Sequence, residues 1–82
     1  MKLKYVMLEG NNEFLIFQPS LDHNEVVPRG KEARSAGFVE ISPDKEKERG
    51  IAADCYGEST SLKLKSQPKH DSLVITLALN QS

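Results

Sequence analysis

Apolar residues occur along the chain in short runs separated by turn-forming residues, a pattern typical of a β-sheet protein. The first two runs, residues 3–8 and 13–18, flank Gly10-Asn11-Asn12 and predict a β-hairpin, since glycine and asparagine tolerate positive φ. The four apolar residues in the middle of the second run are continuous and do not alternate with polar ones. They predict a strand that is covered on both faces and lies at the centre of the sheet.

The segment Ser20–Val27 predicts a short helix of about two turns. Ser20 or Asp22 supplies a cap, and Pro28 ends the helix because it cannot continue it. The basic segment 29–34 then predicts a connector to the next strand.

Two further apolar runs, residues 36–42 and 51–56, flank the mixed-charge segment 43–50. They predict two antiparallel strands joined by a solvated loop. Gly37, inside the first of these runs, indicates either a bulge or a close approach of another backbone segment.

The last part of the chain contains two more candidate strands. Residues 61–65 alternate, with Leu62 and Leu64 on one side and lysines on the other, as in a half-buried strand. Residues 73–79 would place Leu73, Ile75, Leu77 and Leu79 on one face of a strand, although Asp71 or Ser72 could instead cap a helix. We expect a strand here. The pattern as a whole predicts a single small α+β domain over residues 1–82, with a mostly antiparallel sheet of five or six strands and one short helix.

Composition excludes several classes of protein. Of 82 residues, 38% are hydrophobic and 28% charged, which is ordinary for a soluble globular domain, and the formal net charge is −1. That balance argues against a general electrostatic grip on nucleic acid or anionic membranes. No apolar run approaches a signal-peptide core or the ~20 residues of a membrane helix, so we expect a cytoplasmic protein with no membrane contact. A chain this small buries little core alone, so homodimerisation is expected.

The densest polar chemistry lies in residues 54–61, between two predicted strands. A tyrosine there supplies a rigid anchor, and hydroxyls supply adaptable hydrogen bonds. We therefore expect an exposed bend with the thiol of Cys55 turned inward and the hydroxyls turned outward. The predicted binding residues are Tyr56, Glu58, Ser59 and Ser61, with His23 and Arg34 as neighbours.

Catalytic and metal-binding interpretations are weaker. Cys55 with His23 or His70 would suit a cysteine-dependent hydrolase, but Cys55 shares its strand face with apolar residues, which favours a buried thiol. Gly57-Glu58-Ser59 lacks the closing glycine of a nucleophile elbow, so a turn is preferred in which Gly57 has positive φ and Ser59 or Thr60 bonds the backbone. The histidines, the cysteine and the acidic residues show no zinc-type spacing, and no cofactor is expected.

A small nucleic-acid-binding protein is the main alternative. Basic residues fall into three groups, and aromatic residues lie on the predicted strands, as in single-strand binders. The three groups are Lys2 and Lys4; Lys63 and Lys65; and Arg29, Lys31 and Arg34. They would form a basic stripe only if the fold placed them on one face.

Three segments resemble a recurring signature of short uncharacterised proteins of bacteria, phages and mobile elements. These segments are Ser35-Ala36-Gly37-Phe38-Val39, Cys55-Tyr56-Gly57-Glu58-Ser59 and Ser61-Leu62-Lys63-Leu64-Lys65-Ser66-Gln67-Pro68. Such proteins tend to have a histidine that opens a small helix, as His23 does here. The chain departs from them at Gln67, where arginine is more usual, and at Lys69-His70, where acidic residues are commoner; these differences count against an anion site at that corner. The resemblance implies a fold-sized unit and no known reaction. The sequence therefore predicts a non-enzymatic binding or interaction module that forms a homodimer.

Overall fold

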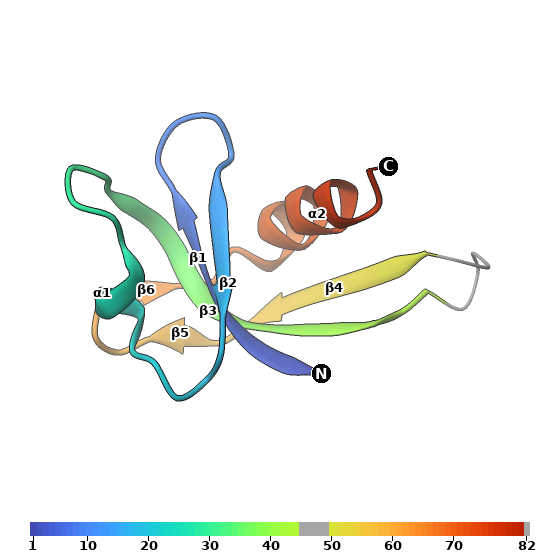
Figure 1. Ribbon diagram of the computed structural model, residues 1–82, viewed down its shortest axis with the longest axis horizontal. Coiled ribbons are helices and arrows are strands. Elements are labelled where there is room, and N and C mark those ends of the chain that lie inside the picture. Colours follow the sequence, from blue (N-terminus) through green and yellow to red (C-terminus); the bar gives the residue numbers. More distant parts are fainter. Residues whose placement is uncertain (45–49, 82) are drawn as a thin grey trace.

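The computed structural model describes residues 1–44 and 50–81 and confirms a small α+β fold (Figure 1). Four antiparallel strands form one sheet in the order β2-β1-β3-β4, and β5 pairs with β6 in a second, two-stranded sheet. The elements are β1 (Lys2–Leu8), β2 (Phe14–Phe17), α1 (His23–Val26), β3 (Ala33–Pro43), β4 (Ile51–Tyr56), β5 (Glu58–Ser59), β6 (Leu64–Lys65) and α2 (Pro68–Leu79). The predicted charged loop between β3 and β4 falls largely on residues 45–49, outside the described residues.

Both faces of the larger sheet carry an apolar cluster, because successive residues of β1 point to opposite faces. On one face Tyr5 and Met7 pack with residues of β3 and β4 and with Ile75 of α2. On the other face Val6 and Leu8 pack with Ala36, beneath α1 and the β5–β6 segment. The central strand β1 is therefore buried continuously from residue 5 to residue 8.

The prediction that the second strand lies at the centre of the sheet is wrong, because β2 is an edge strand. Its continuous apolar run is explained by cover on both faces of the sheet. Phe14 and Ile16 pack toward the cluster on the α2 side, and Leu15 and Phe17 pack toward the cluster on the α1 side. The pattern correctly indicated two covered faces, but covered faces do not fix a strand's place in the sheet.

The strand predicted for residues 73–79 is also wrong, because these residues belong to helix α2. Pro68 occupies the first turn, where its missing N–H costs nothing, and Gln67 is the cap in place of Asp71 or Ser72. The side chains that α2 turns inward include Asp71 and Ile75, four residues apart. Leu73 and Leu77 point to solvent and are 60% and 58% exposed. Neither helix in the described part of the chain is long and apolar enough to cross a membrane.

Smaller differences follow from local backbone geometry. Only Leu64–Lys65 of the predicted strand 61–65 is extended, because residues 60–63 form a turn in which Lys63 has a φ of 56°. Arg34 lies in β3 and not in a connector. The short helix is confirmed, with Asp22 as its cap: the Asp22 N–H donates to the Glu25 carboxylate at 3.1 Å.

Helix α2 lies along the outer edge of β4 and bonds to its backbone (Figure 1). Ser72 accepts a backbone N–H at 2.8 Å, Thr76 accepts one at 3.1 Å, and Asn80 accepts one at 2.8 Å and donates to a carbonyl at 2.7 Å. The strand residues so bonded are Cys55, Ala53 and Ile51, in that order. Side chains that are four residues apart on the helix therefore bond to residues that are two apart on the strand. Because these bonds occupy the outward backbone groups of β4, another strand cannot pair with that edge.

Candidate functional site

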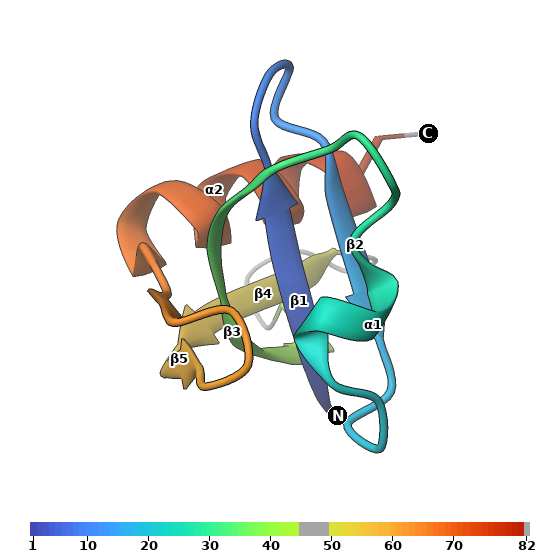
Figure 2. The same ribbon diagram turned by 90° about the vertical axis from the view of Figure 1, so that its left-hand side faces the viewer.

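A pocket of about 370 Å³ opens between the start of α1 and the turn that follows β4. Both segments lie on the same side of the larger sheet and face the viewer in Figure 2. Its volume falls within the range of small-molecule and side-chain pockets. The residues that line it are Lys4, Asp22, His23, Phe38, Gly57, Glu58, Thr60 and Ser61.

His23 lines the pocket from the first position of α1 and is only 4% exposed. Its Nε2 lies 2.8 Å from the Gly37 carbonyl oxygen, which can only accept, so Nε2 carries a proton and donates. In the neutral ring Nδ1 is then an acceptor, and no hydrogen bond to it is found within residues 1–44 and 50–81. Phe17 and Phe38 hold the ring edge-on, with centroids 5.4 and 6.3 Å away.

The rim of the pocket is built by the bend after β4. Gly57 has a φ of +78°, which directs the chain sharply out of β4 toward Glu58. The Ser61 hydroxyl accepts the backbone N–H of Asn24 at 3.2 Å and so fixes the bend to α1. Three of the residues that were predicted to lie on one surface, Glu58, Ser61 and His23, do line the same pocket.

Ser59 does not belong to that surface. It is 2% exposed, and its hydroxyl accepts the backbone N–H of Leu62 at 3.2 Å. The prediction that its hydroxyl faces outward is therefore wrong, because the turn needs that oxygen for its own backbone. The turn interpretation itself, with positive φ at Gly57 and a serine bonded to the backbone, is confirmed.

Tyr56 lies beside the pocket and outside its lining. The ring is stacked on Phe38 with centroids 5.8 Å apart, and the residue is 40% exposed. Lys2 places its ammonium nitrogen 4.7 Å from the centroid of Phe38. The result is a short aromatic ledge with one cation next to the pocket.

The pocket presents mostly hydrogen-bond acceptors. Asp22 and Glu58 contribute carboxylates, and His23 contributes the acceptor Nδ1. The one cation in the lining, Lys4, already donates to the Leu21 carbonyl at 2.7 Å. Two carboxylates against one ammonium give the lining a formal charge of −1, which favours a cationic donor as the bound group.

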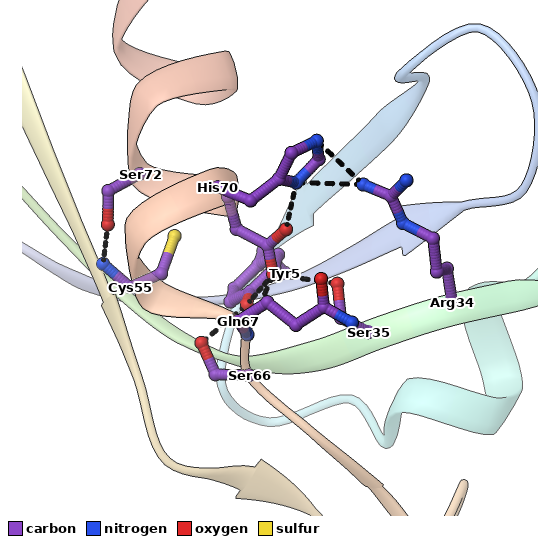
Figure 3. A network of polar contacts seen from close by, with 9 residues as sticks. Tyr5, Arg34, Ser35, Cys55, Ser66, Gln67, His70 and Ser72 are labelled. Carbon is purple, nitrogen blue, oxygen red and sulfur yellow. Dashed lines mark hydrogen bonds and ion pairs between the residues drawn. The ribbon is translucent and has the colours of Figure 1, made fainter.

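A second polar cluster, centred on Asp71, lies where the first turn of α2 meets β1 and β3 (Figure 3). The Asp71 side chain is fully buried. Its Oδ2 accepts from the Tyr5 hydroxyl at 2.5 Å, the Ser35 hydroxyl at 2.7 Å and the Gln67 N–H at 3.1 Å. Its Oδ1 lies 2.9 Å from Nδ1 of His70.

These bonds set the protonation of the cluster. Burial by itself would raise the pKa of the Asp71 carboxyl, but hydrogen bonds from His70, Tyr5, Ser35 and the Gln67 backbone outweigh it and the pKa is lowered. Burial, and then the bond to Asp71, raise the pKa of the Tyr5 phenol. Asp71 is therefore a buried carboxylate held by neutral donors.

Arg34 belongs to this cluster and not to the pocket. Its Nη2 lies 2.7 and 2.9 Å from the two ring nitrogens of His70. Since Nδ1 of His70 donates to Asp71, Nε2 is the nitrogen that can accept from the guanidinium. His70 and Asp71 are neighbours in the first turn of α2, and their side chains bond to each other.

The Asp71 cluster fastens α2 to the sheet. Its donors come from β1, β3 and the residues that precede the helix, so it joins three segments through one carboxylate. Sequence analysis missed Tyr5 and Ser35, since each lies in a strand pattern without a polar motif. The available signal was an aspartate placed four residues before Ile75, on the inward side of an amphipathic helix.

The inward orientation of Cys55 is confirmed, at 5% exposure. Burial raises the pKa of its thiol to about 11, so the thiol is protonated at neutral pH. Within residues 1–44 and 50–81 no hydrogen bond joins the Cys55 thiol to His23 or His70. Among the same residues no group of three or more histidine, cysteine or acidic side chains converges as a metal site would require.

Comparison with protein-family models, curated proteins and solved structures found no match to this chain. The resemblance to short bacterial and phage proteins stays a prediction, and the candidate site rests on its own geometry.

Proposed function

We propose that the protein is a non-enzymatic binding module that also self-associates, and that its pocket takes a cationic hydrogen-bond donor. A lysine or arginine side chain of a protein partner and a free amine share this chemistry. The observation that carries the proposal is the lining: the acidic residues Asp22 and Glu58 and the ring of His23, whose Nδ1 can accept a hydrogen bond, line one hollow.

The surface around the pocket supports the same ligand class. Glu40 and Asp54 are opposed on β3 and β4, on the sheet face that also carries Phe38 and Tyr56. Glu40 is paired with the N-terminal ammonium at 2.8 Å, and Lys2 lies over Phe38. The groups beside the aromatic ledge that attract a further cation are therefore the Asp54 carboxylate and the exposed ring of Tyr56.

The nucleic-acid alternative gains less support. Lys4 is held by a backbone carbonyl, Lys31 lies 3.6 Å from the Glu13 carboxylate, and Arg34 is engaged with His70. Carboxylates beside the aromatic ledge would repel phosphates. The cysteine-hydrolase alternative gains less still, because a protonated and buried Cys55 thiol is a poor nucleophile.

The test is an NMR titration of the ¹⁵N-labelled protein with agmatine, which carries a guanidinium and an amine. Backbone amides of Gly57, Glu58, Thr60 and Ser61 are expected to shift with a dissociation constant on the order of 1 mM, as befits a single small group. Glu58→Gln is expected to weaken binding about tenfold, since it removes a charge-assisted hydrogen bond.

Glu32→Gln is the matched control, because it removes the same charge from a residue that precedes β3 and does not line the pocket. It is expected to leave the titration unchanged. Equal weakening by both variants would reduce the effect to net charge, and no shift at the pocket in the wild type would reject the pocket as the binding site.

A further inference from the structure

The outer edge of β2 carries backbone groups that face away from the sheet. The Leu8 N–H donates to the Glu13 carbonyl at 2.8 Å, in the register that joins β1 and β2. In an antiparallel pair such bonded positions alternate with unbonded ones. The N–H and C=O groups of Leu15 and Phe17 therefore point toward β1, and those of Phe14 and Ile16 point outward.

No hydrogen bond to these outward groups exists within the described ranges 1–44 and 50–81. Val26 and Val27, which follow α1, pack against the apolar cluster on the α1 side of the sheet, and the Lys31 ammonium lies 3.6 Å from the Glu13 carboxylate. These contacts are made by side chains, so they leave the outward backbone groups of Phe14 and Ile16 without a partner among the described residues.

We propose that this edge pairs with β2 of a second copy of the chain, antiparallel, about a two-fold axis at Leu15. In that register Phe14 lies opposite Ile16 of the second copy, and each opposed pair exchanges two backbone bonds, about four in all. In this register Phe14 and Ile16 of both copies lie on the face of the sheet that α2 covers, so the apolar cluster continues across the junction. The four-stranded sheets of the two copies would then form one continuous sheet.

The second copy fits this edge better than an arbitrary strand does. An isologous contact requires a self-complementary surface, and Phe14–Phe17 contains four apolar residues and no charge. Glu13 lies opposite Phe17 of the second copy, so no like charges face each other across the junction. The alternative contact through Leu73 and Leu77 of α2 has no unbonded backbone groups to satisfy.

This inference rests on the proposed self-association and names its surface. The test measures the dimer dissociation constant by sedimentation equilibrium for the wild type, Ile16→Pro and Ile16→Val. Proline removes an outward N–H without removing a bond to β1, and it is tolerated on edge strands. We expect Ile16→Pro to raise the dissociation constant more than tenfold and Ile16→Val to change it less than threefold.

Far-UV circular dichroism checks that Ile16→Pro is folded. Were it unfolded, hydrogen exchange on the wild type decides instead: protection of the Phe14 and Ile16 amides must rise with protein concentration. A folded Ile16→Pro that still dimerises, or amides insensitive to concentration, overturns the β2 assignment while leaving self-association intact. A wild type that stays monomeric at about 1 mM overturns self-association itself, and the agmatine titration is unaffected by either outcome.

Discussion

The two edge strands of the larger sheet, β4 and β2, differ in whether their outward backbone groups are hydrogen-bonded. The outward N–H groups of β4 are bonded to Ser72, Thr76 and Asn80 of α2, whereas those of β2 have no such partner in the ranges that the structure describes. An edge strand can thus be protected by side chains of a helix as well as by another strand. A helix with polar side chains at a spacing of four thus pairs one edge of the sheet, and within the described residues the outward groups of the opposite edge stay unpaired.

The largest expected effect comes from releasing the helix that covers β4. Asp71→Ala removes the carboxylate that joins α2 to β1 and β3. The buried Ser35 hydroxyl then loses its acceptor, and the Tyr5 hydroxyl keeps only its bond to the Ser66 hydroxyl at 2.6 Å. We expect the free energy of unfolding to fall by about 3–5 kcal/mol, measured by urea denaturation. The exposed Asp54→Ala, on the other face of the sheet, should change it by less than about 0.5 kcal/mol.

The same carboxylate gives the fold a pH dependence of defined sign. The pKa of Asp71 is lowered in the folded protein, so its stabilising contribution is present above the ordinary value of 3.8 and is lost as the pH falls below it. The urea midpoint of the wild type should therefore decline on acidification below about pH 4, and this component should be missing from Asp71→Asn. A parallel decline in both proteins would place the acid sensitivity elsewhere.

A smaller effect is expected from removing one of the side chains through which α2 bonds to the edge of β4. Thr76→Val keeps the shape of the side chain but removes its bonds to both backbone groups of Ala53. We expect a loss of about 1–3 kcal/mol in the free energy of unfolding. The Thr76→Val, Ile16→Pro double variant is expected to stay monomeric in sedimentation equilibrium, because Ser72 and Asn80 still bond the edge of β4.

Leu73→Ala is the control for that experiment, since it alters the exposed side of the same helix. It should change neither stability by more than about 0.5 kcal/mol nor association.

The smallest effect concerns the chemistry of Cys55 beneath the protected edge. The pKa of its thiol is raised by burial from an ordinary 9.0 to about 11, so at pH 8 about a hundredfold less thiolate is present than for a free cysteine. Iodoacetamide should therefore label the folded protein at least that much more slowly than the urea-unfolded one, as followed by mass spectrometry. Rapid labelling of the folded chain would contradict the burial and reopen the hydrolase alternative.

Strands were predicted correctly where an apolar run of strand length is bounded by residues that favour turns. The run 51–56 matches β4, and Gly10-Asn11-Asn12 turns between β1 and β2 with positive φ at Gly10 and Asn12. The close approach predicted at Gly37 is confirmed as well, because an added Cβ would lie 2.5 Å from the Tyr56 carbonyl oxygen.

Helix α2 was missed because its leucines and isoleucine fall on every second position, which satisfies a strand as well as a helix. The residues that distinguish the two structures are the polar ones. Ser72, Thr76 and Asn80 recur every four residues, and the buried Asp71 lies four residues before the buried Ile75. A polar series with helical spacing inside an apolar run is a signal that the alternation alone conceals.

The candidate site was only partly predictable. His23, Glu58 and Ser61 were grouped by polar density and helix position, and they do share one pocket. Ser59 and Arg34 were assigned by the same reasoning, but one is consumed by its own turn and the other by His70. Whether a polar atom is free for a ligand depends on tertiary partners, which local sequence does not specify.

Gly37 has a consequence for how the pocket exists at all. Its carbonyl oxygen anchors the imidazole of His23, while the space where a methyl group would stand admits the backbone of residues 56 and 57. The close packing of the bend against β3 thus depends on the absence of a Cβ at this position. Alanine there would place its Cβ 2.5 Å from the Tyr56 carbonyl oxygen, so the bend that forms the rim of the pocket would have to shift relative to the carbonyl that holds His23.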